Sequence, residues 1–340
     1  MFSDRFDRFR RLEDLGARAL ERIAEAHIAI VGMGVLGCYS ADLLARLGVR
    51  NLRIIDRDIL QPSDLGHQIL YEYADAQNNL PKVEAAGKKL SAINPSVQVE
   101  GLFVDLNPSN VIDYLDDMDV ILDGLDNLAA RFLLNDAALE LGIPWVSCSS
   151  AGASGMVIGI PVGGSPCFRC LVPEFPSPGS TPSCDTIGIW PPAAHWAAGH
   201  AVWLAIQGLL NQWQDWGKLF TLDRFPSDLH IVNVNQDPAC PACVDGMREF
   251  LRGDKYPKAF FLCGRDEVTI LPASERPWNL DEVLRKWNGP EKLETTPYFV
   301  RFNDNLHEIL LFKDGRVLIR GVQSVEEAQR LWGLTFGQWI

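Results

Sequence analysis

Short apolar runs alternate with longer segments of helical periodicity through the first half of the chain. Residues 27–31 form an apolar run typical of a buried strand, and leucines recur at helical spacing between the glycine-rich stretch 32–37 and Gly48. Residues 51–56 predict a second strand. A β-α-β unit of this length is typical of nucleotide-binding folds.

The same alternation continues further along the chain. Strands are predicted at 97–104, 118–123 and 144–149, and helices at 81–93 and 128–141. Strands that alternate with helices pair mainly in parallel. The sequence therefore predicts an α/β fold with a doubly wound, mainly parallel, Rossmann-like sheet.

The pattern differs at the amino-terminal end and after residue 150. Residues 5–25 predict an amphipathic helical segment, and residues 193–212 predict another helix. The stretch 172–183, just before the second of these helices, is crowded with Pro, Ser and Gly. It predicts an exposed, mobile loop.

The carboxy-terminal region predicts a small separate domain. A hairpin is expected from 308–312 and 316–320 around a Lys-Asp-Gly turn, and a helix follows Ser324. The predicted parts are an N-terminal helical segment (1–25), a Rossmann-like α/β domain (26–250) and a small α+β C-terminal domain (265–340).

Composition and charge narrow the classes of function. The chain has 340 residues, of which 47% are hydrophobic and 22% charged, as in ordinary soluble globular proteins. No apolar run approaches the roughly 20 residues of a membrane helix, and the chain opens on a charged stretch rather than a signal peptide. We therefore expect a cytoplasmic protein that does not act at a membrane. The formal net charge of −13 argues against a nucleic-acid partner.

A glycine-rich turn follows the first predicted strand. Gly32, Gly34 and Gly37 permit a tight turn and a close approach of the backbone to a phosphate, which the start of the next helix favours electrostatically. Asp56 ends the second strand, where its carboxylate can accept hydrogen bonds from ribose hydroxyls. The motif predicts a nucleotide, and by itself it fits NAD or FAD as well as ATP.

Four of the eight cysteines form two C-x-x-C pairs, Cys167 with Cys170 and Cys240 with Cys243. Two such pairs complete a tetrahedral zinc site, whose role is structural because four thiolates leave no open position for catalysis. A thioredoxin-like redox pair is the alternative, although that chemistry needs only one of the two pairs.

A dinucleotide-type turn joined to a distal pair of C-x-x-C motifs resembles the ThiF/MoeB/HesA family, bacterial relatives of ubiquitin-activating enzymes. Members of that family adenylate the Gly-Gly terminus of ThiS- or MoaD-like sulfur carriers. The tail resembles the ThiF-type adenylyltransferases of thiazole synthesis. The matching stretches are 5–8, 32–37, 55–58, 80–82, 123–127 with Arg131, 184–188, 261–266 and 312–318.

The resemblance implies a role for each matching residue. Lys82 would reach the phosphates of ATP, Asp126 would hold Mg²⁺, and Arg8 would act on the neighbouring subunit of a homodimer. Cys184 would form a covalent link with the carrier during sulfur transfer. The implied nucleotide-binding residues are Gly32, Gly34, Gly37, Asp56, Asp58, His67, Gln68 and Arg131.

Each of these residues also has a purely structural interpretation. Lys82 fits a solvated lysine at a helix start, and Asp126 fits the cap of the helix predicted at 128–141. Arg8 fits a surface arginine, and Cys184 an incidental reduced thiol.

One stretch departs from the family pattern. The family usually has S-N-L-x-R-Q after the second strand, whereas residues 63–68 read S-D-L-G-H-Q. His67 replaces the arginine and is mostly neutral at pH 7. Asp64 replaces the asparagine and would repel phosphate unless a metal intervenes. Arg57 is a nearby residue that can compensate for the lost charge.

The sequence thus predicts a zinc-stabilised homodimer that uses ATP and Mg²⁺ to adenylate a ThiS-like carrier for the thiazole of thiamine. A MoaD-like carrier for molybdenum cofactor synthesis and the carboxy terminus of a small peptide are alternative substrates. Two alternatives come from other classes: an NAD-dependent oxidoreductase and an inactive carrier-binding scaffold.

Overall fold

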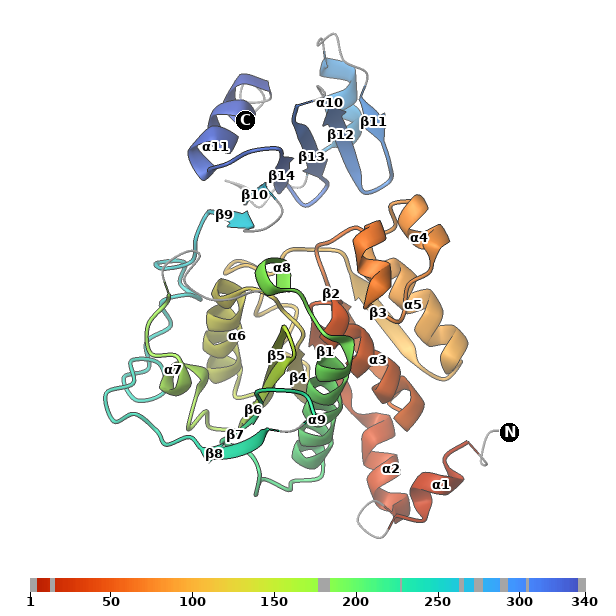
Figure 1. Cartoon of the computed structure of the whole chain (residues 1–340), viewed down its shortest axis with the longest axis vertical. Helices are drawn as coiled ribbons and strands as arrows, with labels where there is room; N and C mark the ends of the chain where they lie inside the picture. The colour runs from red at the N-terminus through yellow and green to blue at the C-terminus, as the bar shows by residue number, and fades with distance from the viewer. Residues whose placement is uncertain are drawn as a thin grey trace. The chain divides into compact units, whose positions relative to one another are not determined.

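The computed structural model describes residues 5–12, 16–176, 184–226, 228–262, 266–271, 278–287, 293–303 and 306–335. The chain divides into two compact units, Met1–Tyr256 and Pro257–Ile340. Each unit is built on its own sheet, and the two sheets appear in Figure 1. The predicted N-terminal segment 1–25 falls in the first unit.

The first unit contains an eight-stranded sheet in which β3, β2, β1, β4 and β5 pair in parallel and β6, β7 and β8 are antiparallel. The predicted mainly parallel α/β sheet is therefore confirmed. In sheet order the strands are β3 (Gln98–Leu102), β2 (Asn51–Ile55), β1 (His27–Val31), β4 (Val120–Asp123), β5 (Trp145–Ala151), β6 (Ser154–Ile160), β7 (Lys218–Leu222) and β8 (Leu229–Asn233).

The helices of the first unit largely follow the predicted ranges, and the described residues of the expected helical segment 5–25 contain two helices. None of the helices in the described part of the chain combines the length and the apolar character needed to cross a membrane. The helices are α1 (Asp7–Arg10), α2 (Gly16–Glu25), α3 (Val35–Leu47), the 3-10 helix η1 (Pro62–Gly66), α4 (Tyr73–Gln77), α5 (Lys82–Ile93), α6 (Leu128–Leu141), α7 (Phe168–Leu171), α8 (Cys184–Ile187) and α9 (Pro191–Leu209).

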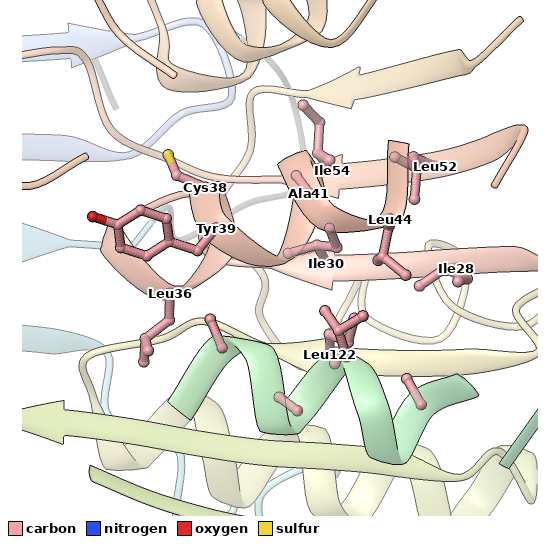
Figure 2. Close-up of a cluster of buried hydrophobic side chains, with 14 of the residues drawn as sticks. Ile28, Ile30, Leu36, Cys38, Tyr39, Ala41, Leu44, Leu52, Ile54 and Leu122 are labelled. Atoms are coloured by element: carbon pink, nitrogen blue, oxygen red, sulfur yellow. The ribbon is translucent and has the colours of Figure 1, made fainter. Parts of the chain in front are cut away.

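Helices α3 and α9 cover one face of this sheet, as Figure 1 shows. Ile28 and Ile30 of β1 point to that face, and Leu44 of α3 packs against them in the cluster drawn in Figure 2. The buried side of α9 is made largely of alanines. Because alanine is small, α9 packs closely against α3, and this contact fixes the start of α3 at the end of β1.

Helix α6 covers the opposite face, which is filled by aromatic rings. The ring of Phe132 lies 4.8 Å from that of Phe250 and 5.6 Å from that of Phe168. Asn127 caps the start of α6 by accepting a hydrogen bond from the Ala130 N–H at 2.8 Å. The helix is thus anchored at the carboxyl end of β4.

The second unit contains a six-stranded antiparallel sheet with a core that includes Val268, Ile309 and Ile319. The predicted hairpin is confirmed as β13 and β14, and Gly315 in its turn has φ +98°. In sheet order the strands are β11 (Glu294–Thr295), β12 (Phe299–Asn303), β13 (Glu308–Phe312), β14 (Val317–Arg320), β10 (Glu267–Ile270) and β9 (Ala259–Leu262), and the helices are α10 (Leu280–Lys286) and α11 (Val325–Thr335).

Candidate active site and metal centre

The central strand β1 lies between β2 and β4, at the point where the strand order of the parallel sheet reverses. In open α/β sheets, ligands bind outside the carboxyl ends of the strands at such a point. Two turns lie at this point of the sheet, residues 32–37 after β1 and residues 124–127 after β4, and we call the place between them the crevice. The Gly124 N–H donates to the Val31 carbonyl at 2.7 Å, so the two turns are held together by the backbone.

The glycines of the first turn differ in what surrounds them. Gly32 has φ +92°, and a Cβ on it would lie 2.7 Å from the Gly124 backbone. A Cβ on Gly37 would lie 1.9 Å from the Gly32 carbonyl oxygen. Gly34 has open space instead, since its nearest neighbour would be the Gly124 oxygen at 4.0 Å. Gly32 and Gly37 are therefore required by the packing of the chain, whereas Gly34 leaves space that a ligand can occupy.

Helix α3 begins directly at this open space. Gly34 is its N-cap and Val35 its first residue, and its first turn carries no acidic side chain. The N–H groups at a helix start carry partial positive charge and commonly bind phosphate. The turn is thus suited to an anionic group.

Asp56 lies at the end of β2 beside the same turn. Its carboxylate accepts hydrogen bonds from the Met33 N–H at 2.5 Å and the Asp58 N–H at 2.6 Å. Burial raises the pKa of Asp56 to about 6, against the opposing effect of Lys82. These bonds fix a buried acceptor where the ribose of a nucleotide is expected.

Lys82 is the first residue of α5, and its side chain is only 5% exposed. Its Nζ lies 3.1 Å from Asp58 Oδ2 and 3.9 Å from Asp64 Oδ1. Burial opposes the charge of Lys82, but Asp58, Asp56 and Asp64 together raise its pKa well above the usual value. Lys82 is therefore a buried ammonium, and the solvated-lysine interpretation is wrong.

Asp126 lies exposed in the turn after β4. Because Asn127 caps α6, the alternative role of Asp126 as the cap is wrong. Arg131 is buried, with Nε donating to Asp123 Oδ2 at 2.7 Å and Nη2 to the Leu125 and Cys148 carbonyls. Its guanidinium holds the turn that carries Asp126, and its direct contact with a nucleotide stays a prediction.

The residues of η1 and those after it form a polar network near Lys82. Gln68 Nε2 donates to Asp64 Oδ1 at 2.9 Å, and the partly exposed His67 lies beside the same amide. Gln68 Oε1 is buried without a hydrogen-bond partner among the described residues. Arg57, a possible replacement for the missing family arginine, lies 3.3 Å from Asp105 and 3.9 Å from Asp58.

The structure says less about the two remaining predicted catalytic residues. Arg8 is exposed on α1. Cys184 is the first residue of α8, but its side chain lies outside the described part of the chain, as does most of the loop expected at 172–183. Both roles stay predictions.

The four predicted metal ligands meet in one cluster, with all four sulfurs within 4.8 Å of one another. The Cys167 and Cys240 sulfurs are 3.6 Å apart, and those of Cys170 and Cys243 are 3.5 Å apart. Zn–S bonds of about 2.3 Å in a tetrahedron place sulfurs about 3.8 Å apart. The Asp237 N–H points to the Cys170 sulfur at 3.5 Å, as is common around zinc thiolates. The residues present therefore fit a Zn²⁺ ion.

This cluster lies toward the edge of the sheet opposite to the glycine turn. Cys243 borders a cavity of about 140 Å³ together with Ile143, just before β5, and Pro161, just after the antiparallel β6. These positions mark the amino-terminal edge of the parallel strands. The metal centre is therefore placed to stabilise the fold rather than to take part in chemistry at the crevice.

The residues that the sequence did not single out act through the backbone or through ion pairs. Gly124 packs against Gly32, and Asp105 pairs with Arg57. For Gly124 the signal was its place in the D-G-L-D-N stretch directly after a predicted strand. For Asp105 the sequence carries no comparable signal.

Several known proteins are similar to this chain in sequence or fold. The model of the ThiF family matches residues 6–242. The sulfur carrier protein ThiS adenylyltransferase of Bacillus subtilis is 31% identical over 332 residues, which cover 96% of this chain and 98% of the relative. The sulfur carrier protein adenylyltransferase of Thermus thermophilus is 32% identical over 248 residues, 71% of this chain and 91% of the relative. The crystal structure of E. coli MccB with ATP matches the fold with a TM-score of 0.61 at 18% identity, over 71% of this chain and 75% of that chain.

The two kinds of glycine predict opposite outcomes on substitution. Gly34→Ala should fold normally, because its Cβ meets open space, and should weaken Mg–ADP binding by about tenfold or more because it fills that space. Gly37→Ala should fail to fold, because its Cβ would collide with the Gly32 carbonyl. Thermal melting and calorimetric titration measure both effects. Normal Mg–ADP affinity in a folded Gly34→Ala protein would contradict the assignment.

The metal centre predicts a loss of stability when a ligand is removed. Cys240→Ser should lose the bound metal and lower the melting temperature by roughly 10 °C or more, because a structural zinc site contributes folding energy. Cys148→Ser is the control, since Cys148 is buried outside the cluster and should leave the metal content unchanged. Elemental analysis and thermal melting give the two readouts. A Cys240→Ser protein with full metal content would refute the assignment.

Proposed function

Because the chain belongs to the ThiF family, we propose that it is an adenylyltransferase that uses ATP to activate the C-terminal glycine carboxylate of a ThiS-like sulfur-carrier protein for thiamine thiazole synthesis. The observation that carries this proposal is the crevice itself. Open space at Gly34 lies beside the start of α3, Asp56 accepts a hydrogen bond from Met33 in the same turn, and Asp56 in turn acts on the charge of the buried Lys82. A triphosphate needs this combination, whereas a carrier-binding scaffold has no use for a buried lysine.

In the proposed reaction a carboxylate oxygen of the carrier attacks the α-phosphorus of ATP, and pyrophosphate leaves. Little covalent chemistry falls to the protein, so its contribution is positioning and charge stabilisation. The N–H groups of α3 and the Lys82 ammonium bind the phosphates, and Asp56 orients the ribose. Arg8 of a second subunit completes the site in a homodimer, and Cys184 takes part in later sulfur transfer.

Among the described residues, only the four cysteines are grouped closely enough to hold a metal by themselves. Asp126 is exposed at the crevice, so it would hold Mg²⁺ together with phosphate oxygens of ATP. The ion would neutralise charge on the departing pyrophosphate. Zn²⁺ at the cysteine cluster would serve the fold alone.

The choice of carrier rests on the second unit. The B. subtilis ThiS adenylyltransferase aligns with 96% of this chain, so the similarity extends well into Pro257–Ile340. The T. thermophilus sulfur carrier protein adenylyltransferase aligns with only 71%. Similarity to a ThiS adenylyltransferase across both units supports a ThiS-like carrier over a MoaD-like carrier. An NAD-dependent oxidoreductase remains the alternative from another class, and stabilisation by NADH but not by Mg–ATP would favour it.

Carrier-dependent ATP–pyrophosphate exchange tests the proposal directly. The exchange should require a ThiS-like protein and proceed more slowly with a MoaD-like protein in a parallel assay. Lys82→Ala and Asp126→Ala should each slow exchange by about 100-fold, because each removes a charge that stabilises the transition state. Lys88→Ala, an exposed lysine on the same helix, is the control and should retain full activity. Absence of exchange with either carrier would refute the proposed reaction.

A further inference from the structure

Asp64 is an unexpected residue in a crevice suited to phosphate. Its side chain is only 5% exposed, and Oδ1 lies 3.9 Å from Lys82 Nζ. The same oxygen accepts from Gln68 Nε2 at 2.9 Å, and Oδ2 accepts from the Gln61 N–H at 2.9 Å. A buried carboxylate is costly, and here both these hydrogen bonds and the nearby ammonium stabilise it. Lys82 therefore already has two carboxylate partners, Asp58 and Asp64.

The other charges nearby do not offset Asp64. Asp56 also acts on Lys82, so three carboxylates surround one ammonium. Arg57 also pairs with Asp58, and its guanidinium is engaged by Asp105 as well. The crevice around Lys82 is therefore electrically negative before a phosphate arrives. A metal-free triphosphate has to displace Asp64 from Lys82 against this charge, whereas a divalent cation bound to the phosphates reduces the repulsion.

Capping of η1 does not require this arrangement. Asp75 performs the same role in α4, where its Oδ2 accepts from the Glu72 N–H at 2.9 Å, and it is partly exposed. An asparagine at position 64 can still accept from the Gln61 N–H. Its amide nitrogen can also donate to Gln68 Oε1 after rotation of the Gln68 amide, and this oxygen has no partner among the described residues. The negative charge of Asp64 is thus separable from its structural role.

We propose that Asp64 is a positioning residue that makes the crevice select a nucleotide complexed with a divalent cation over the metal-free nucleotide. It acts through Lys82, which it holds by ion pairing until a less negative metal–nucleotide complex enters. The inference rests on the proposed nucleotide function and adds a basis for selectivity to it.

The test compares two dissociation constants of α,β-methylene-ATP, one in excess Mg²⁺ and one in excess EDTA, by calorimetric titration. Asp64→Asn should tighten binding of the metal-free nucleotide by about tenfold and change binding of the magnesium complex by less than about threefold. Asp75→Asn, the matched capping variant, should change neither constant. In a Lys82→Gln background the effect of Asp64→Asn should largely disappear, because the two residues act together.

The other outcomes of these titrations distinguish a failure of the role of Asp64 from a failure of the proposed function. An unchanged ratio of the two constants in Asp64→Asn, or an equal change in Asp75→Asn, overturns the inference. A full effect that persists with Lys82→Gln overturns the action through Lys82. If Asp64→Asn does not fold, Asp64→Ser, whose hydroxyl can accept from the Gln61 N–H, replaces it under the same criteria. A wild-type protein that binds neither form overturns the proposed function itself, whereas binding with an unchanged ratio overturns only the role of Asp64.

Discussion

The contact between two backbone turns is the constraint on which the crevice depends. Gly32 and Gly37 of the first turn pack against each other, and Gly32 also packs against Gly124 of the turn after β4 with no room for a Cβ. The Gly124 N–H and the Val31 carbonyl are joined across the same contact. This packing sets the start of α3, and therefore the direction of its N–H groups, relative to the end of β4. The ligand space at Gly34 exists because its neighbours on both sides are fixed in this way.

Ion pairs are the second feature that determines which ligand the crevice can bind. Lys82 is buried and Arg57 is partly buried, and each is paired with carboxylates on the segments that follow β2 and β3. An isolated buried charge is costly, so Lys82 keeps its charge because the carboxylates are present, whereas the guanidinium of Arg57 is always charged and is stabilised by its partners. The same carboxylates compete with an incoming phosphate. The carboxylates hold the cations of the crevice in place and partly neutralise them. The affinity of the crevice for a ligand should therefore depend strongly on the charge of that ligand.

The sequence predicted the parallel half of the sheet because β1, β2 and β4 are largely apolar and each is followed by helical segments. It missed β7, and it missed the two strands beside β7: β6 is interrupted by Gly155 and Gly159, and every residue of β8 is exposed. Neither strand has an alternating pattern. The cysteine spacing predicted the metal cluster, but only the tertiary fold shows that it lies away from the glycine turn. The pairing of Lys82 with Asp64 could not be predicted, because it depends on how η1 folds back on the start of α5.

The central claim is that the glycine turn presents a triphosphate to Lys82 and to Asp126. A crystal structure with Mg²⁺ and α,β-methylene-ATP tests it most directly. The account predicts phosphate oxygens within hydrogen-bonding distance of Lys82 Nζ and of the first N–H groups of α3, with the metal ion between the phosphates and Asp126. A nucleotide bound with its phosphates away from both side chains would contradict the account, even if the fold were unchanged.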